Sequence, residues 1–247
     1  MNARSIGFEK MATPNSETSP ILVVAALGRE LASLNRAAID GIELLETGEG
    51  TDNARGSLEA WLKQNKARSI VSIGFAGALS STLQAGDLVI ASRVRDGVAQ
   101  PDNALVSAAE TVQIAEVPVH KGIAITTNEI IWQAESKRAL AATLEPGEIG
   151  IVDMESTSIA SVCYRHGVPF IIVRSITDLL DEDLPLNFNL YRGEDGRVDS
   201  ARIVKAALFR PRALSALMEL RRRSELCANR MADFVRVLAP LISQRRQ

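Results

Sequence analysis

Two carboxylates, Glu155 and Asp178, end neighbouring apolar segments of the chain and are the first candidates for chemistry. Residues 149–153 predict a strand with an acidic end, residues 158–166 a helix, and residues 170–174 a second strand. Strands joined by a crossover helix are expected to run parallel, so both carboxylates should face one crevice where α/β sheets bind ligands. Two carboxyl groups with different pKa values can act as acid and base.

Alternating strand and helix signals predict one α/β domain around this pair. Residues 93–110 are ambiguous, residues 179–197 predict a long acidic loop, and the rest predicts one or two amphipathic helices broken at Pro211. The other predicted strands are 21–27, 42–46, 69–73, 87–91, 111–116 and 120–126, and the other predicted helices are 30–38, 53–64 and 133–143.

Four motifs lie between residues 21 and 183. They are Gly28-Arg29-Glu30 after the first strand, the Gly-rich turn 72–78, Gly86-Asp87 before a strand, and Asp153-Met154-Glu155-Ser156 with Ser175-Ile176-Thr177-Asp178. In this order they resemble the nucleoside phosphorylase and nucleosidase superfamily, in particular its methylthioadenosine/S-adenosylhomocysteine nucleosidase branch. The resemblance implies a single-domain, three-layer αβα fold with a mixed, partly parallel central sheet.

The resemblance implies cleavage of the bond between a purine and ribose. Such cleavage passes through a ribose cation and needs a protonated leaving base and an activated nucleophile. Asp178 matches the family's acid, which must hold a proton near neutral pH, and Ile176 and Leu179 are the expected apolar walls around it. Glu30 matches the carboxylate that activates water, although a Glu in a first helical turn also simply favours the helix dipole.

The resemblance also implies a set of substrate-binding residues. Glu155 matches the residue that accepts hydrogen bonds from ribose hydroxyls, and Met154 the one that packs on the sugar. Gly74, Ala76 and Gly77 would let the backbone approach the sugar or base closely, while a plain tight turn is the structural alternative. The remaining expected substrate-binding residues are Phe75, Thr177 and Ile131.

Hydrolysis and phosphorolysis differ in the nucleophile that attacks the sugar, which is water in the first and phosphate in the second. Related phosphorylases carry Arg-Val-Gly-Ser at the Gly-rich turn, whereas this chain has Ser72 and Phe75 in place of the cation and the hydroxyl. Water is therefore the expected nucleophile, and a nucleoside phosphorylase is the alternative. A non-catalytic nucleoside-binding protein is a second alternative, disfavoured because binding alone does not need all three carboxylates. Three arginines could still restore a phosphate site: Arg29, Arg55 and Arg174.

The region after Asp178 resembles the hopanoid-associated branch of the superfamily in segments 181–185, 196–199 and 210–214. That resemblance implies an adenine nucleoside with a large or apolar 5′ substituent, such as adenosylhopane in hopanoid biosynthesis. From residue 201 onward the chain has 11 Lys and Arg against 3 Asp and Glu, while the first 200 residues have 17 against 27. This basic tail is expected to pack on the sheet or a second subunit, with contact to an anionic membrane surface as the alternative.

Composition limits the other function classes. With 247 residues, 46% of them hydrophobic, the chain is long enough for one core, so we expect a catalytic domain at 21–247 after a polar, flexible leader at 1–20. No apolar run approaches the roughly 20 residues of a membrane span. Two cysteines and two histidines show no metal-binding spacing. We expect no metal, cofactor or nucleic-acid partner, and a homo-oligomeric, dimeric enzyme of the cytoplasm, peripheral to the inner membrane if the tail binds lipid.

Overall fold

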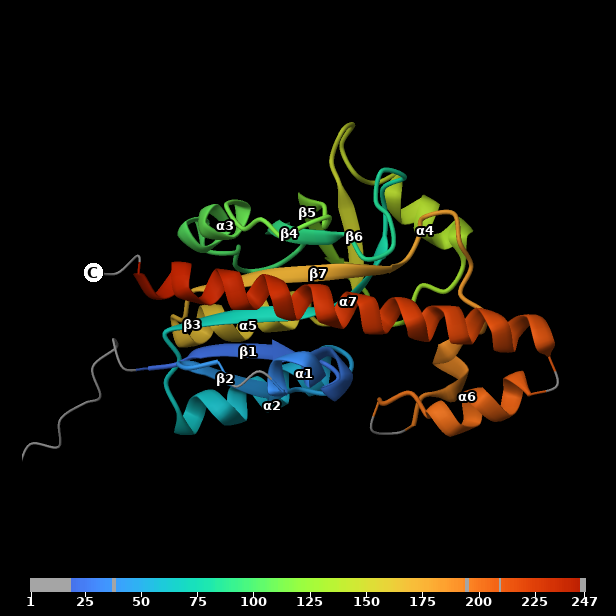
Figure 1. The fold of residues 1–247 in the computed structure, drawn as a ribbon, viewed down its shortest axis with the longest axis horizontal. Helices are drawn as coiled ribbons and strands as arrows, with labels where there is room; N and C mark the ends of the chain where they lie inside the picture. The colour runs from blue at the N-terminus through green and yellow to red at the C-terminus, as the bar shows by residue number, and fades with distance from the viewer. Residues whose placement is uncertain (1–18, 37–38, 194–195, 209, 245–247) are drawn as a thin grey trace, which may run out of the picture.

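The computed structural model describes residues 19–36, 39–193, 196–208 and 210–244, so the predicted leader lies outside the described residues except for its last two positions. Within these ranges the chain forms one sheet and a set of helices (Figure 1). The strands are β1 (Ile21–Ala25), β2 (Ile42–Glu46), β3 (Ser69–Ala78), β4 (Leu88–Val94), β5 (Val119–Thr126), β6 (Gly150–Asp153) and β7 (Phe170–Asp178). The helices are α1 (Gly28–Asn35), α2 (Thr51–Gln64), α3 (Asn103–Glu110), α4 (Ala134–Ala141), α5 (Ser156–His166), the 3-10 helix η1 (Phe188–Tyr191), α6 (Ser200–Ala207) and α7 (Pro211–Gln244).

The sheet has the strand order β2-β1-β3-β6-β5-β4-β7, and β3 also pairs with β7. Five strands therefore close into a ring, which leaves β1 and β2 as an extension of the sheet at β3. Pairing is parallel in β1–β2, β1–β3, β3–β7, β4–β5 and β5–β6, and antiparallel in β3–β6 and β4–β7. The expected mixed, partly parallel sheet is confirmed.

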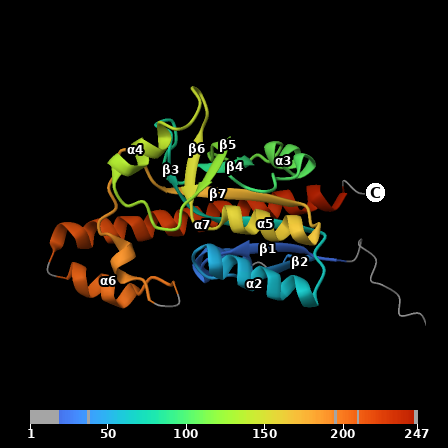
Figure 2. The same cartoon turned by 180° about the vertical axis from the view of Figure 1, so that it is seen from behind.

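Alternating side chains of β1 show how the layers form. Ile21 and Val23 belong to a core shared with α1, α3 and α7, whereas Leu22 and Val24 belong to a core shared with α2 and α5. Successive residues of a strand point to opposite faces, so one strand supplies both cores. Figure 1 shows α7 crossing the front of the sheet, and Figure 2, the view from the opposite side, shows α5 and α2 covering the other face. The three-layer αβα arrangement is confirmed.

The basic tail was expected to pack on the sheet or a second subunit, and helix α7 shows where part of it packs. Pro211 is its first residue, a position where the missing N–H of proline costs no helical hydrogen bond. Phe234 and Leu238 are fully buried against the sheet. Met218, nearer the start of the helix, is 60% exposed. The second half of α7 therefore packs on the sheet, whereas its first half projects beyond it beside α6 (Figure 1).

Two local predictions were wrong. Residues 111–116 were predicted as a strand but form a turn after α3, in which Val112 is buried in the core. Val112 and Ile114 are apolar because they pack in the core shared with α1, α3 and α7. The Gly-rich segment 72–78 was predicted as a strand-to-loop turn but lies inside β3, because β7 pairs along almost its whole length and β6 pairs with its end.

The predicted parallel arrangement around α5 was also wrong. Strands β6 and β7 do not pair with each other, and they run in opposite directions, because β6 is antiparallel to β3 and β7 is parallel to it. Their carboxyl ends still meet, since Gly77 of β3 has Val152 as its partner on one side and Asp178 on the other. The closed ring thus produces the convergence that was expected from a parallel pair.

None of the helices in the described part of the chain is long and apolar enough to cross a membrane.

Candidate active site

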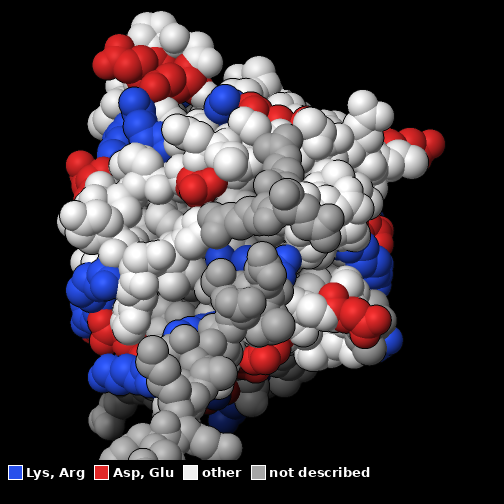
Figure 3. Space-filling view, turned by 90° about the vertical axis from the view of Figure 1, so that its left-hand side faces the viewer, with Lys and Arg blue, Asp and Glu red and all other residues white. Residues whose placement is uncertain are grey.

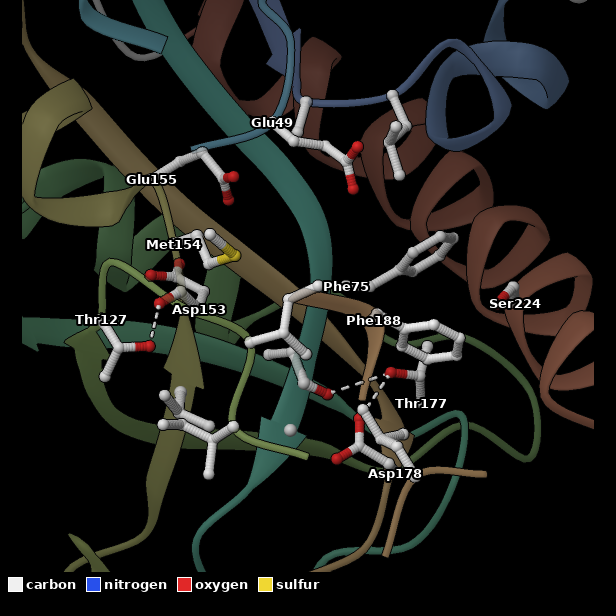
Figure 4. A pocket seen from close by; sticks show the side chains of 18 of the residues that line it. Glu49, Phe75, Thr127, Asp153, Met154, Glu155, Thr177, Asp178, Phe188 and Ser224 are labelled. Atoms are coloured by element: carbon white, nitrogen blue, oxygen red, sulfur yellow. Dashed lines mark hydrogen bonds between the residues drawn. The ribbon is translucent and has the colours of Figure 1, made fainter. Parts of the chain in front are cut away.

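A pocket of about 850 Å³, including its opening to solvent, lies where β1, β3, β6 and β7 end. In Figure 4, Glu49 and Glu155 lie at one end of this pocket, and Thr177 and Asp178 at the other. Of the ten residues predicted for the site, nine line the pocket and Gly74 does not. The nine are Glu30, Phe75, Ala76, Gly77, Ile131, Met154, Glu155, Thr177 and Asp178.

Glu30 lies in the first turn of α1 and is 2% exposed. Its Oε2 accepts a hydrogen bond from the Leu27 N–H at 2.8 Å, and its Oε1 accepts one from the Phe75 N–H at 2.9 Å. Burial raises the pKa of Glu30, and the two backbone donors oppose that effect. A buried carboxyl group with a raised pKa is a stronger base when ionised, and each oxygen retains a lone pair for water.

The two glycines of β3 lie beside carboxylates. A Cβ on Gly74 would lie 3.3 Å from Glu30 Oε1, and a Cβ on Gly77 would lie 3.0 Å from Asp178 Oδ2. The sequence suggested that these glycines let the backbone approach the sugar or base. The structure gives Gly74 another neighbourhood, against Glu30 and Arg174, and gives Gly77 a second role as room for Asp178.

A buried ion pair lies beneath the pocket. Arg174 of β7 donates from Nε to Asp153 Oδ2 at 2.8 Å, and from its other nitrogens to the Ser72 backbone and hydroxyl, the Val173 carbonyl and the Ser156 hydroxyl. Asp153 also accepts hydrogen bonds from Ser156 and from Thr126. These bonds fix the turn that carries Met154 and Glu155.

Glu155 is the N-cap residue of α5, and its Oε1 accepts a hydrogen bond from the Gly50 N–H at 2.7 Å. Burial and the nearby Asp153 charge raise the pKa of Glu155 to about 8. Gly50 has φ 89°, a conformation suited to glycine, and this conformation directs its N–H toward the carboxylate. Met154 precedes Glu155 and lines the same end of the pocket.

Asp178 ends β7 with both carboxyl oxygens hydrogen-bonded. Thr177 Oγ1 donates to Oδ1 at 3.0 Å, and Lys137 Nζ of α4 donates to Oδ2 at 2.8 Å. Apolar walls formed by Ile176 and Leu179 were expected here. Instead a buried ammonium lies against the carboxylate, and Leu179 contributes its carbonyl oxygen to the same ammonium.

The pocket lining is strongly acidic. Among the described residues that line it, Arg29 is the only Lys or Arg, and its guanidinium lies 5.6 Å from the centre of the Phe75 ring. Arg174 is 1% exposed and bonded within the protein, and the exposed Arg55 pairs with Asp52 outside the lining. Two of the three arginines that could have restored a phosphate site are thus engaged elsewhere. Six acidic residues line the pocket: Glu30, Glu49, Glu129, Asp153, Glu155 and Asp178.

Two site residues were missed from the sequence. Glu49 lines the pocket and accepts a hydrogen bond from the Val198 N–H at 2.9 Å, but it had been grouped with the acids of a loop. Lys137 looked like an ordinary surface lysine of a helix. Its spacing from Ala134 and Ala141, three and four residues away, places it on the apolar stripe of α4, and that spacing was the available signal.

The histidines lie outside the pocket lining. His120 Nε2 is 3.1 Å from Asp87 Oδ2, and His166 ends α5 next to Gly167, as the helix pattern predicted. Across residues 19–36, 39–193, 196–208 and 210–244, no group of three or more His, Cys, Asp or Glu side chains has a geometry that could hold a metal ion.

Comparison with known proteins gives the family. A protein-family model described as "Phosphorylase superfamily" matches residues 40–208 of the chain. The chain belongs to this superfamily, and the resemblance read from its motifs is confirmed.

Curated relatives carry nucleosidase names. A 5′-methylthioadenosine/S-adenosylhomocysteine nucleosidase from Shewanella denitrificans is 29% identical over an alignment of 218 residues that covers 75% of this chain and 94% of that protein. One from an Exiguobacterium species is 29% identical over 190 residues, covering 68% of this chain and 80% of the relative.

Solved structures share the fold. The nucleosidase of the same name from Colwellia psychrerythraea, in complex with adenine, has a TM-score of 0.68 at 18% identity, covering 91% of this chain and 96% of that one. The native futalosine hydrolase of Helicobacter pylori has a TM-score of 0.68 at 17% identity, covering 92% and 99%.

Proposed function

We propose that the protein is a nucleosidase, an N-glycosyl hydrolase that releases the free base from a purine nucleoside. In this reaction Asp178 protonates the departing purine, Glu30 activates the attacking water, and Glu155 accepts hydrogen bonds from the ribose hydroxyls. Met154 packs against the sugar, and Phe75 offers an aromatic face in the same pocket. The nucleosidase names of the relatives support this assignment.

The observation that carries the proposal is the surplus of carboxylates in the pocket. The transition state of glycosidic cleavage resembles an oxocarbenium ion, so carboxyl oxygens directed at the sugar stabilise it, most strongly once they are ionised. Phosphate would need cations, but Arg29 is the only Lys or Arg among the described lining residues, and Arg174 is already bonded to Asp153 beneath the pocket. Hydrolysis therefore fits this site better than phosphorolysis.

Incubation of the purified protein with a set of nucleosides, with and without phosphate, tests the proposal. Adenosine, methylthioadenosine, S-adenosylhomocysteine and inosine cover the classes of base and 5′ substituent. We expect release of free base and free sugar at the same rate in both buffers. A strict phosphate requirement, with a sugar 1-phosphate as product, would identify a phosphorylase. Binding without cleavage of any of the four would identify a nucleoside-binding protein.

We further propose that the 5′ substituent is large and apolar, adenosylhopane being the substrate suggested by the hopanoid-associated branch. Phe188 of η1 and Leu220 of α7 line the pocket, while Leu190 and Met218 of the same two elements are 68% and 60% exposed. An apolar substituent leaving the pocket along these elements would meet further apolar surface.

The basic residues near α6 support contact of this region with an anionic membrane surface. Arg202, Lys205, Arg210 and Arg212 are all exposed beside Leu208, which is 56% exposed. On the face at the left of Figure 1, by contrast, patches of Lys and Arg lie among patches of Asp and Glu (Figure 3). Attraction to anionic lipid is worth about 1 kcal/mol per basic residue near the surface and weakens with salt.

Vesicle co-sedimentation tests the membrane contact. We expect binding to anionic vesicles at low salt, loss of binding at high salt, and loss in the variant Lys205→Glu/Arg212→Glu. Arg165→Glu, a charge reversal on α5, is the matched control and should bind like the wild type. Equal sedimentation with neutral and anionic vesicles would contradict the contact, and dimerisation through the same surface would appear as a mass that depends on protein concentration.

A further inference from the structure

The side chain of Lys137 is fully buried beside the candidate acid. Nζ donates one hydrogen bond to Asp178 Oδ2 at 2.8 Å and another to the carbonyl oxygen of Leu179. The side chains of the pair are 0% and 10% exposed, so the ion pair lies almost entirely out of water. A buried ion pair of this kind is expensive to desolvate, and its presence calls for an explanation.

Hydrogen bonds at the start of α4 explain the burial. The Ala134 N–H donates to Asp183 Oδ1 at 2.7 Å, and the Leu184 N–H donates to the Trp132 carbonyl at 2.8 Å. These bonds tie the loop after β7 to the first turn of α4. The loop thereby covers Lys137 and leaves its ammonium facing the end of β7.

We propose that Lys137 and Asp178 act as one acid, in which Lys137 positions the carboxyl group and supplies the proton that Asp178 passes to the departing base. The inference rests on the proposed nucleosidase function. A carboxylate bonded to an ammonium has no proton of its own to give, and Lys137 is the bonded group that carries one. In a buried site, transfer of that proton produces two neutral groups, and this form avoids the cost of two buried charges.

The proton balance of the step is complete. The Nζ–H bond of Lys137 breaks as an O–H bond forms on Asp178, which leaves an amine and a carboxylic acid. The carboxylic O–H then breaks as an N–H forms on the purine, and the electron pair of the glycosidic bond goes to the purine. Water adds to the sugar cation and gives a proton to Glu30. Release of that proton to solvent and uptake of one by Lys137 restore the starting state.

The charged groups around the pair are engaged in bonds of their own. Arg138 pairs with Asp181 at 2.8 Å, and Arg223 of α7 pairs with Glu182 at 2.7 Å. The titratable groups across the pocket occur equally in the wild type and in any Lys137 variant. The charged groups on the elements packed around the pair are Arg138, Asp181, Glu182, Asp183 and Arg223, and the pocket lining adds Arg29, Glu30, Glu49, Glu129, Asp153 and Glu155.

The test is the ratio of kcat/KM for Lys137→Met to that of the wild type, measured from pH 5 to pH 9 on the best nucleoside. Without Lys137, Asp178 must take its proton from water, so the protonated fraction falls as the pH rises. We expect the ratio to fall by about tenfold per pH unit in the upper part of the range, as for loss of one proton. Titrations shared by both proteins cancel in the ratio.

Two further variants separate proton supply from charge. Lys137→Arg keeps a cation, but a guanidinium does not release its proton, so we expect it to be as slow as the Met variant at high pH. Arg138→Met removes the neighbouring, exposed cation and should give a ratio near one at every pH.

Three outcomes overturn the inference: a ratio for the Met variant that is constant with pH, a Met variant faster than the wild type, or full recovery in the Arg variant. If the wild type cleaves no nucleoside, the proposed function fails and takes the inference with it. If the wild type cleaves but the ratio is flat, only the role of Lys137 fails.

Discussion

The two ends of the pocket hold the same kind of side chain in opposite electrostatic settings. At one end, Asp178 is paired with a buried ammonium and a hydroxyl donor. At the other, Glu30 and Glu155 lie near the guanidinium of Arg174, which is already bonded to Asp153 Oδ2. The pKa values of Glu30 and Glu155 are raised, chiefly by burial.

This difference suggests how three carboxyl groups can perform three tasks. A carboxylate with its own cation can receive a proton from that cation and pass it on, so it suits the leaving base. Carboxyl groups such as Glu30 and Glu155, which have no cation of their own among the described residues, are strong bases when ionised and attract a cationic sugar. Environment rather than residue type separates the acid from the base, as in other enzymes with paired carboxyl groups.

Removal of the acid is expected to have the largest effect. Asp178→Asn cannot deliver a proton, so we expect kcat to fall by about 10²–10⁴-fold, the usual contribution of a general acid. The change also leaves the Lys137 ammonium without its counter-charge, which in buried pairs costs about 3–5 kcal/mol of stability. Activity and thermal unfolding should therefore be measured together.

Two controls test whether this result is specific to the end of the pocket that holds Asp178, the acid end. The double variant Lys137→Met/Asp178→Asn removes both charges and should regain stability without regaining activity. Asp181→Asn changes an exposed carboxylate three residues away that pairs with Arg138, and should retain full turnover. Wild-type kcat in a folded Asp178→Asn variant would remove Asp178 from the mechanism.

Loss of the base is expected to be nearly as large. Glu30→Gln retains the shape of the side chain but cannot take a proton from water, so we expect kcat to fall about 10²–10³-fold. One amide nitrogen would also face the N–H of Leu27 or Phe75, so some loss of stability is expected. Turnover that is unchanged while phosphate becomes essential would assign Glu30 a structural role and favour phosphorolysis.

The end of the pocket that holds Glu155 can be examined by measuring protein stability as a function of pH. Glu155 has a pKa of about 8 in the folded protein against 4.5 ordinarily, so the folded state binds a proton that the unfolded state has lost. The stability contribution of this protonated group is complete below about pH 4.5 and is lost as the pH rises through about 8. Glu155→Gln stays neutral and avoids this loss.

We therefore expect Glu155→Gln to be more stable than the wild type at pH 9, by on the order of a few kcal/mol, and similar to it at pH 5. At pH 9, where Glu155 is ionised in the wild type, kcat/KM of the variant should fall roughly 10–100-fold, as for loss of a charge-assisted hydrogen bond worth about 1.5–3 kcal/mol. Thermal melts at both pH values check the first expectation. A variant less stable than the wild type at pH 9 would mean that Glu155 is ionised without cost in the native state.

Much of the fold was predictable because its elements have regular apolar patterns. Strand 42–46 was predicted with its observed bounds, and the helix after Glu155 with its closing Gly167. Closure of the sheet was not predictable, since which strands pair depends on contacts between residues far apart in the sequence. Residues 111–116 show the same limit, because Val112 is apolar for packing in the shared core rather than for forming a strand.

The candidate site divides in the same way. Glu30, Glu155 and Asp178 were found because they end strands or begin helices within recognisable motifs, where residue type and position both carry information. Lys137 belongs to no recognisable motif. Its burial beside Asp178 depends on a loop that covers it only in the folded protein. Arg174 looked like a possible phosphate ligand because the sequence does not show that Asp153 and Ser156 already bind it.

The smallest expected effect concerns the space that β3 leaves for the acid. Gly77→Ala would place a methyl group 3.0 Å from Asp178 Oδ2 and 3.1 Å from a Val152 methyl, so the carboxyl group must shift by a few tenths of an ångström. We expect about a tenfold loss of kcat, because misplacement of catalytic groups is costly even when the displacement is small. Gly56→Ala, inside α2 with nothing within 4 Å of its new Cβ, is the matched control and should keep full activity with slightly higher stability. Equal activity of the two variants would show that the acid end tolerates movement, and would weaken the view that Lys137 and Gly77 together fix the position of Asp178.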